Sequence, residues 1–310
     1  MPPLNQTART FTLNTGHRMP AIGLGTWRSP SDKVQAAVKT ALGAGYRHID
    51  TAAAYENEAA VGAGIRASGV PRHQIWITTK LFNYDHKQVA RALDESLGRL
   101  GVEYVDLYLM HWPCSVDAAA KPKAVYKDWD FCDTWREMQK LVGTGKVRNI
   151  GISNFETVNL QKLLAHPDCK ARLFPPPVVP AVNQVELHPG YPSPKLFALN
   201  SKHGIHTTAY SCLGSQDSPL YQDSTLLQIA KAKAKTPQQV LLMWGLQKGW
   251  SVIPKSVTPS RIEDNFKLDG WELTADQVKE IDGISEKAGT FKVCDDKWLP
   301  ARVFDSELQK

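Results

Sequence analysis

The sequence has few features of a membrane, secreted or disulfide-linked protein. None of its apolar runs approaches the roughly 20 residues that a membrane helix needs. The first ten residues, MPPLNQTART, lack the apolar core of a secretory signal. We therefore expect a cytoplasmic protein with no membrane partner. The cysteines are odd in number, widely spaced and free of any CxxC pair, which indicates neither a disulfide framework nor a metal site: Cys114, Cys132, Cys169, Cys212 and Cys294.

A long basic run is also missing. The chain has 37 Lys and Arg against 31 Asp and Glu, a formal net charge of +6, and these residues are spread along its whole length. Nucleic-acid-binding proteins usually gather their cations on one face or along one helix. The charge therefore favours a small anionic ligand, or no charged partner at all, and we expect no nucleic-acid partner.

The third absence is a G-x-G-x-x-G motif after a strand. The glycines of Gly23–Trp27 (GLGTW) and Gly62–Gly64 (GAG) fail the required spacing, which disfavours a Rossmann domain. A Tyr-x-x-x-Lys pair, used by another class of reductases, occurs at Tyr191 and Lys195. Two prolines lie between them and should break the helix that this pair requires, so we interpret the match as chance.

The residues that are present alternate between short β-like runs and helical stretches, about eight times. With 310 residues, 42% hydrophobic and 22% charged, the chain can bury a sizeable core. No linker interrupts it. We predict an α/β fold, one (β/α)₈ TIM barrel domain over residues 1–310, with an N-terminal β-hairpin at residues 10–19 and a tail from residue 285 over the active-site face. The expected strands are 22–24, 46–50, 75–80, 105–111, 147–153, 181–185, 205–210 and 251–253.

Four reactive side chains fall where these strands end. Asp50, Lys80 and His111 end the second, third and fourth strands, and Tyr55 begins the loop after the second. Active sites of such barrels lie at the carboxyl ends of the strands, so all four should face one cavity. Taken singly, each has a plainer interpretation: Asp50 as a helix cap, Lys80 as a surface lysine, His111 as a core histidine, and Tyr55 as a loop anchor.

Together the four residues make chemical sense. A tyrosine hydroxyl can be a general acid at neutral pH if a neighbouring ammonium lowers its pKa, and Lys80 would supply that charge. Asp50 would hold Lys80 in place and keep it protonated, and His111 would orient a substrate carbonyl. Such a site protonates an oxygen while a hydride donor attacks the carbon.

These residues lie in segments that together resemble the aldo-keto reductases over nearly the whole chain. The segments are GLGTW (23–27), YRHIDTAAAYENE (46–58), ITTKL (77–81), VDLYLMHWP (105–113), GKVRNIGISNF (145–155), NQVELHP (183–189) and IPKSVTPSRIEDN (253–265). The resemblance implies a (β/α)₈ barrel that binds NADPH or NADP⁺ without a Rossmann fold, and a catalytic tetrad of Asp50, Tyr55, Lys80 and His111. Within the family, the chain looks most like fungal-type glycerol dehydrogenases and aldehyde reductases.

The resemblance also implies which residues bind the cofactor. Ser153, Asn154 and Gln184 would hold the nicotinamide carboxamide, with Tyr210 stacked on the ring. Lys255, Ser256 and Arg261 would surround the 2′-phosphate, and Asp264 and Asn265 would lie near the adenine, although Asp264 is one carbon shorter than the glutamate often found there. The remaining expected cofactor residues are Gly25, Thr26, Trp27, Asp50, Ser211, Leu213, Ser215 and Val257.

The expected reaction is NADPH-dependent reduction of aldehydes or ketones to alcohols, with small polar or sugar-type carbonyl compounds such as glyceraldehyde as substrates. Aromatic side chains should line the pocket, and the expected substrate-binding residues are Trp27, Tyr55, His111, Trp112 and Trp298. Trp129 could equally line the pocket or pack under a loop. The sequence does not show whether Cys294 reaches the pocket.

Two other functions remain open at this stage. The chain could be an NADPH-binding sensor with little turnover, which the intact tetrad disfavours. It could also be a barrel isomerase or aldolase that forms a Schiff base on Lys80, which would need a neutral lysine that Asp50 disfavours. We expect a monomer.

Overall fold

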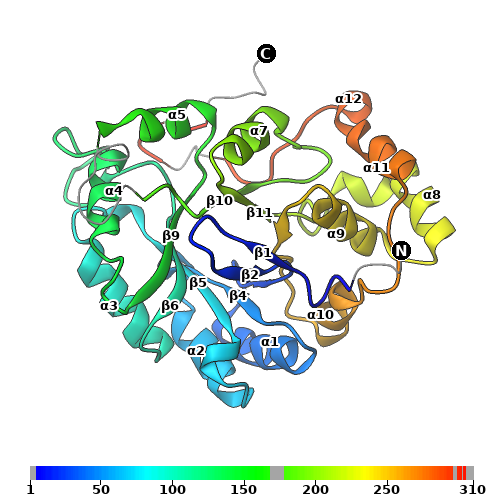
Figure 1. The fold of residues 1–310 in the computed structure, drawn as a ribbon, viewed down its shortest axis with the longest axis horizontal. Helices are drawn as coiled ribbons and strands as arrows, with labels where there is room; N and C mark the ends of the chain where they lie inside the picture. Colours follow the sequence, from blue (N-terminus) through cyan, green and yellow to red (C-terminus); the bar gives the residue numbers. More distant parts are fainter. Residues whose placement is uncertain (1–4, 168–177, 296–298, 302, 305–310) are drawn as a thin grey trace.

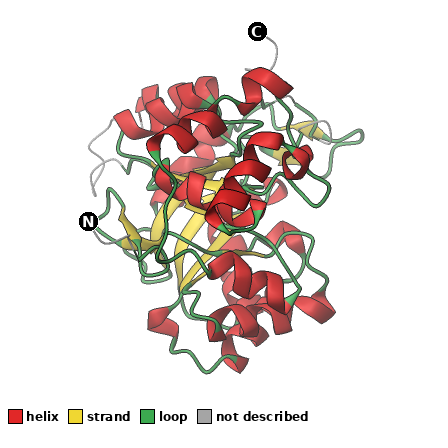
Figure 2. Ribbon diagram, turned by 90° about the vertical axis from the view of Figure 1, so that its right-hand side faces the viewer, coloured by secondary structure: helices red, strands yellow, loops and turns green. Residues whose placement is uncertain are grey.

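The computed structural model describes residues 5–167, 178–295, 299–301 and 303–304 of the chain. A parallel sheet of eight strands forms its centre, and helices surround the sheet (Figures 1 and 2). The strand order is β12-β11-β10-β9-β6-β5-β4-β3. The strands are β3 (Leu24–Gly25), β4 (His48–Asp50), β5 (Trp76–Leu81), β6 (Val105–Met110), β9 (Val147–Ser153), β10 (Val182–Glu186), β11 (His206–Tyr210) and β12 (Ser251–Val252).

The two edges of this sheet lie next to each other. Parallel bridges join Ile22 to Val252 and Gly25 to Lys255, on the β3 and β12 sides. The backbone N–H of Gly25 donates to Pro254 O at 3.1 Å. A Cβ at Gly25 would lie 2.7 Å from Ile253 O, so only glycine permits this approach. The curled parallel sheet is consistent with the predicted (β/α)₈ barrel.

The helices form where the apolar residues recur at helical spacing. In α3, four residues face the core from one side, Val89, Leu93, Leu97 and Leu100, and Gly101 in the left-handed conformation (φ 67°) ends the helix. The helices are α1 (Ser31–Gly43), α2 (Glu58–Ala67), α3 (Val89–Leu100), α4 (Phe131–Gln139), α5 (Thr157–Ala165), α7 (Pro194–Lys202), α8 (Ser224–Lys233), α9 (Pro237–Gln247), α10 (Pro259–Phe266), α11 (Ala275–Asp282) and α12 (Ile284–Ala288). None of the helices in the described ranges is long and apolar enough to cross a membrane.

An antiparallel hairpin precedes the sheet and consists of β1 (Thr10–Thr12) and β2 (Arg18–Pro20). Figure 1 shows it across the middle of the ring of strands. Its buried side chains Leu13 and Met19 join an apolar cluster with Trp76 and Val182, which begin β5 and β10. The hairpin therefore packs against the amino-terminal end of the sheet and leaves the carboxyl ends of the strands to the site.

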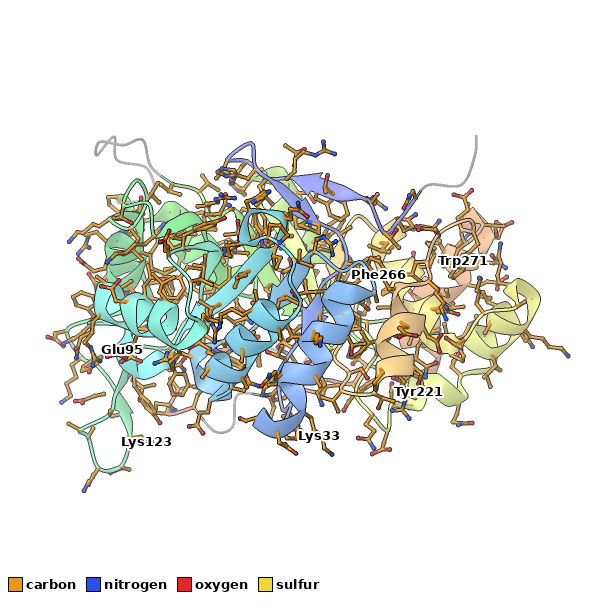
Figure 3. The ribbon with its side chains drawn as sticks, turned by 90° about the horizontal axis from the view of Figure 1, so that it is seen from below. Lys33, Glu95, Lys123, Tyr221, Phe266 and Trp271 are labelled. Atoms are coloured by element: carbon orange, nitrogen blue, oxygen red, sulfur yellow. The ribbon has the colours of Figure 1, made fainter. Side chains whose placement is uncertain are left out.

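Two segments differ from the sequence-based expectation. Helix α7 was not predicted, because the prolines near Tyr191 suggested that no helix could form there. Pro194 is instead the first residue of the helix, where its missing N–H costs nothing. The segment 114–130 has no clear hydrophobic period in the sequence, and β7 (Val116–Asp117) and β8 (Ala124–Val125) pair in it. Lys123 lies near the tip of this projecting ribbon (Figure 3).

Figure 3 also shows how the last strand-helix units are placed beside the first. Phe266, the last residue of α10, stacks on Tyr46 with ring centroids 4.3 Å apart. The Tyr46 hydroxyl donates to Ile262 O at 3.0 Å. These contacts position the segment 255–265, which carries the cations predicted to bind the cofactor phosphate, next to α1.

Candidate active site

Three neighbouring strands bring the four predicted catalytic residues together at their carboxyl ends. Asp50 is the last residue of β4, Lys80 lies one residue before the end of β5, and His111 follows β6 directly. Tyr55 lies in a short 3₁₀ turn, Ala53–Tyr55, after β4. The parallel register of β4, β5 and β6 places these strand ends side by side.

Asp50 and Lys80 form a fully buried ion pair. Lys80 Nζ donates to Asp50 Oδ1 at 2.6 Å and to Thr51 O at 2.9 Å. The two side chains are 1% and 2% exposed. Burial lowers the pKa of Lys80, and the Asp50 carboxylate opposes this by raising it. Asp50 therefore stabilises the charged form of Lys80, and its other oxygen accepts from Gln184 Nε2 at 2.7 Å.

The phenol of Tyr55 is in contact with this pair. Lys80 Nζ donates to the Tyr55 hydroxyl at 3.3 Å. The pKa of Tyr55 is raised well above its usual value, first by burial and then by the charges of Asp50 and Cys294. This direction differs from the lowered pKa expected from the sequence, because desolvation outweighs the single ammonium. Tyr55 is thus a protonated phenol at neutral pH.

His111 faces Tyr55 across the site. The two rings meet edge to face, with centroids 5.6 Å apart. Burial lowers the pKa of His111 well below its usual value, and the charges of Lys80 and His86 act in the same direction. The imidazole is therefore neutral. Its Nδ1 has no hydrogen-bond partner within the described residues, so the ring is not committed to an internal network.

The residues predicted to hold the nicotinamide amide lie beside the ion pair at the ends of β9, β10 and β11. Asn154 Nδ2 donates to His111 O at 2.9 Å, and Asn154 Oδ1 accepts from the Tyr210 hydroxyl at 2.7 Å. Ser153 Oγ donates to Gln184 O at 2.8 Å. These bonds fix the side chains in one cluster. Asn154 has a φ of 63°, a left-handed conformation that asparagine tolerates better than most residues.

The turn after β3 lies against Asp50 from the other side. Both N–H and Oγ1 of Thr26 donate to Asp50 O, at 3.1 Å and 2.9 Å. Asn57 Nδ2 donates to Thr26 O at 3.0 Å and to Ser29 O at 3.1 Å, which fixes the turn. Trp27, in this turn, is partly exposed.

The loop after β11 contains the predicted pyrophosphate residues Ser211, Leu213 and Ser215. Ser211 and Ser215 have left-handed backbones, with φ of 47° and 77°, and Gly214 between them has a φ of 71°. The N–H of Gly214 donates to Ser211 O at 2.7 Å. This loop turns tightly at the edge of the site.

The predicted phosphate-binding cations Lys255 and Arg261 are both exposed, with Ser256 and Val257 between them. A third cation, Arg28, was not predicted from the sequence. Its guanidinium lies 4.4 Å from the centroid of the Trp27 ring, and its charge contributes to lowering the pKa of Lys255 after burial. Its position could have suggested a role, since Arg28, like Tyr55, lies in the loop directly after a strand of the sheet.

The predicted adenine-binding residues lie at the end of α10. The Asp264 carboxylate accepts from Lys267 Nζ at 2.9 Å, so it is engaged by an exposed ion pair. Asn265 is buried. The structure brings the two residues onto the same helix as Arg261.

Part of the predicted wall of the substrate pocket lies within the described residues. Trp112 is buried and packs on Phe304 with ring centroids 5.4 Å apart. Trp129 Nε1 donates to Thr134 Oγ1 at 2.9 Å, a contact with the start of α4. Cys294 lies within hydrogen-bonding reach of Tyr210. Trp298 lies outside the described residues.

Among the residues that the structure describes, no cluster of three or more His, Cys, Asp or Glu could hold a metal ion. The four cysteines within the described ranges are free thiols. The site thus combines one compensated ion pair, a neutral phenol, a neutral imidazole and a cluster of amides. Such a site is suited to acid-assisted reduction or oxidation at a carbon-oxygen bond.

This arrangement defines an oxidoreductase, and comparisons with known proteins agree. The Aldo/keto reductase family matches residues 21–286, and the chain belongs to this family. It is 43% identical to the glycerol 2-dehydrogenase (NADP(+)) of Saccharomyces cerevisiae, over 97% of this chain and 98% of that one. An aldehyde reductase of the same yeast is 42% identical, with the same coverage. The family and the cofactor in the first relative's name support the predicted use of NADPH/NADP⁺.

A solved structure agrees on the fold. The aldose reductase of Schistosoma japonicum superimposes with a TM-score of 0.83, at 36% identity, over 92% of this chain and 94% of that one. The predicted family and enzyme class are therefore confirmed.

Proposed function

We propose that the chain reduces aldehydes or ketones to alcohols with NADPH, and that its substrates are small polar or sugar-type carbonyl compounds such as glyceraldehyde. The observation that carries this proposal is the buried chain of contacts from Asp50 through Lys80 to the Tyr55 hydroxyl, with the His111 ring opposite. Relatives named as a glycerol dehydrogenase, an aldehyde reductase and a methylglyoxal reductase support the class of substrate.

Tyr55 is the proton donor in this proposal. Burial keeps the phenol protonated in the resting site, because it raises the pKa of Tyr55. When the proton moves to the substrate oxygen, a phenolate remains, and the Lys80 ammonium 3.3 Å away stabilises it. Asp50 holds this ammonium in position and favours its charged form. The ammonium charge that stabilises the phenolate is therefore in place before the proton is transferred.

His111 orients the carbonyl group. As a neutral imidazole it carries one ring N–H, which donates to the substrate oxygen, and its low pKa keeps it from competing with Tyr55 as the acid. The edge-to-face contact of the two rings supports an arrangement in which both donors reach one oxygen. Trp27 and Trp112 supply apolar walls beside them.

NADPH, when bound, supplies the hydride. The cations in the cofactor region fit a polyanion, because Arg28, Lys255 and Arg261 make no ion pair with a carboxylate in the described part of the chain. Lys255, Ser256 and Arg261 would hold the 2′-phosphate, with Val257, Asp264 and Asn265 beside them. Arg28 would act with the loop of Ser211, Leu213 and Ser215 on the pyrophosphate, and Gly25, Thr26 and Trp27 would border the cofactor.

The amide cluster would hold the nicotinamide. The Asp50 carboxylate accepts from the Gln184 amide NH₂, which leaves the Gln184 carbonyl oxygen to accept from the ligand. Ser153 and Asn154 would complete the contacts to the carboxamide, and the Tyr210 ring, fixed by its bond to Asn154, would stack on the nicotinamide.

The proposal includes the architecture predicted from the sequence: one domain over residues 1–310, a closed barrel, and a tail covering the active-site face. The packing of Phe304 on Trp112 supports the last point. The predicted cytoplasmic location and monomeric state stay predictions; size-exclusion chromatography with light scattering tests the second.

Steady-state kinetics tests the function. We expect oxidation of NADPH with glyceraldehyde, dihydroxyacetone, aldoses, uronates or aromatic aldehydes, and the ranking of kcat/KM defines the substrate. Tight NADPH binding without turnover of any of these compounds would instead favour the sensor function. Trapping of a substrate adduct on Lys80 by borohydride would favour Schiff-base chemistry.

A further inference from the structure

Four consecutive residues of the tail, Phe291–Cys294, each contact the carboxyl-terminal side of β10 or the segments that flank it. We call residues 291–294 the tail anchor. The contacts involve backbone and side-chain groups alike, and the barrel residues that receive them are Glu156, Glu186, His188 and Gly190. The sequence of this part of the tail has no clear hydrophobic period.

The side-chain carboxylate of Glu186, the last residue of β10, binds the backbone of the anchor. Its Oε1 accepts from Val293 N at 2.5 Å, and its Oε2 accepts from Cys294 N at 2.8 Å. Oε1 also accepts from His188 Nε2 at 2.9 Å, and both side chains are fully buried. A carboxylate that receives two successive backbone N–H groups fixes the direction of that backbone, since only one orientation satisfies both donors.

Gly190 receives the start of the anchor. The N–H of Phe291 donates to Gly190 O at 3.0 Å, and the Phe291 ring stacks on His188 with centroids 4.6 Å apart. A Cβ at Gly190 would overlap the Phe291 ring. The φ of Gly190 is not positive, so the absence of a side chain here serves the ring and not the backbone.

Lys292 completes the anchor with an ion pair of low exposure. Its Nζ lies 3.0 Å from Glu156 Oε1, and the side chains are 9% and 7% exposed. Tyr191 donates its hydroxyl to the same oxygen at 2.6 Å. A cavity of about 10 Å³, large enough for a single water, lies between Glu156, Glu186 and Lys292. The anchor is therefore closely packed against the barrel.

The anchor determines where the tail meets the reaction centre. Cys294, its last residue, lies within hydrogen-bonding reach of Tyr210, and its charge when ionised would act on Tyr55. Farther along the tail, Phe304 packs on Trp112 next to His111. Glu186 and Gly190 make no described contact with Tyr55 or His111. Glu186 is paired with Tyr210 across β10 and β11, so it also adjoins the site through the sheet, whereas Gly190 meets the tail through Phe291.

We propose that Glu186 and Gly190 are positioning residues that dock the tail in one register and thereby set the affinity for the carbonyl substrate. The inference rests on the proposed function for its kinetic consequence. Releasing the anchor would move one wall of the substrate pocket while leaving the exposed cations at the phosphate end untouched. Substrate affinity should therefore fall without a matching loss of cofactor affinity.

Two variants act on the anchor from different sides. Glu186→Gln keeps the shape but turns an NH₂ group towards a backbone N–H, and Gly190→Ala places a methyl group where the Phe291 ring lies. Gly98→Ala is the matched control, because a Cβ there meets nothing within 4 Å. We expect both anchor variants to raise the KM for glyceraldehyde about tenfold, with the Kd for NADPH and kcat within about twofold of the parent values, and the control to match the parent.

A readout that does not depend on catalysis follows the tail directly. The rate at which a maleimide labels Cys294, assigned by peptide mapping, should rise about tenfold in both anchor variants, because release of the backbone exposes the thiol. A parent chain without carbonyl reductase activity would refute the proposed function, and the labelling rates would still test the anchor. Unchanged labelling and KM in both variants, or an equal loss of NADPH affinity, would overturn the inference.

Discussion

Replacing Lys80 by methionine tests the centre of the site, because the change removes the ammonium and keeps most of the side-chain volume. In the parent chain, Asp50 accepts from Lys80 at 2.6 Å and from Gln184 at 2.7 Å. In the variant only the Gln184 bond to this carboxylate would remain, at a position that is 2% exposed in the parent chain. Removing one partner of a buried ion pair costs about 3–5 kcal/mol, so the free energy of unfolding should fall by that amount.

The same variant should lose catalysis for a different reason. The Tyr55 phenolate formed by proton transfer would lose the ammonium that lies 3.3 Å from its oxygen. A hydrogen bond to a charged group is worth about 1.5–3 kcal/mol, more where water is excluded, so kcat should fall at least about a hundredfold. Substrate and NADPH affinities should change much less, because this interaction forms mainly in the transition state.

A second substitution separates the two effects. Adding Asp50→Asn to Lys80→Met removes the unpaired carboxylate, so the double variant should recover about half or more of the lost stability without recovering kcat. Urea unfolding and steady-state kinetics on the parent, both single variants and the double variant measure this. A single Lys80→Met loss below about 1 kcal/mol would contradict the described ion pair. Activity above about a tenth of the parent's would show that Lys80 is not needed for proton transfer.

Three further results are expected. Tyr55→Phe should lower kcat by several orders of magnitude, with NADPH affinity nearly unchanged; a variant that keeps a tenth of the activity would refute Tyr55 as the acid. Arg261→Ala should weaken NADPH binding at least about tenfold and NADH binding hardly at all, with a smaller effect in high salt; fluorescence titration measures both, and equal weakening would indicate a structural role. Burial lowers the pKa of His86 to about 3. The free energy of unfolding should therefore fall by about 1.4 kcal/mol per pH unit for this residue as the pH falls from about 6.5 towards 3. Urea unfolding should show a shallower fall with pH in His86→Gln, and an equal pH dependence in the two chains would contradict a neutral buried His86.

Much of the fold, and the grouping of the four residues proposed as the tetrad, could be predicted because active sites of parallel barrels lie at the carboxyl ends of the strands. Hydrophobic periodicity located the eight strands, and the rule that loops at their carboxyl ends form the site brought Asp50, Lys80 and His111 together. The structure places these residues on adjacent strands, in contact or across from one another. The pKa of Tyr55 could not be predicted in the same way, because its direction depends on how completely the phenol is desolvated.

Other features depend on contacts between segments far apart in the chain. Helix α7 escaped prediction because a proline can begin a helix as well as break one, and its neighbours decide which. Arg28 became a candidate only when the structure placed it near Lys255, more than 200 residues later in the chain. Glu186 is buried at the end of a strand, and only the folded tail reveals that its carboxylate accepts backbone N–H groups.

The distribution of charge explains how one site can accept both a neutral carbonyl compound and an anionic cofactor. At the reaction centre, the ion pair of Asp50 and Lys80 is internally compensated, and Tyr55 and His111 are neutral, so a neutral carbonyl compound can enter without displacing a strongly hydrated charge. In the region proposed to bind the cofactor, exposed cations have no carboxylate partner among the described residues and are available to bind a polyanion. The cofactor can therefore gain its affinity from charges far from the reacting carbon, while proton transfer depends on a pair that solvent and salt scarcely reach.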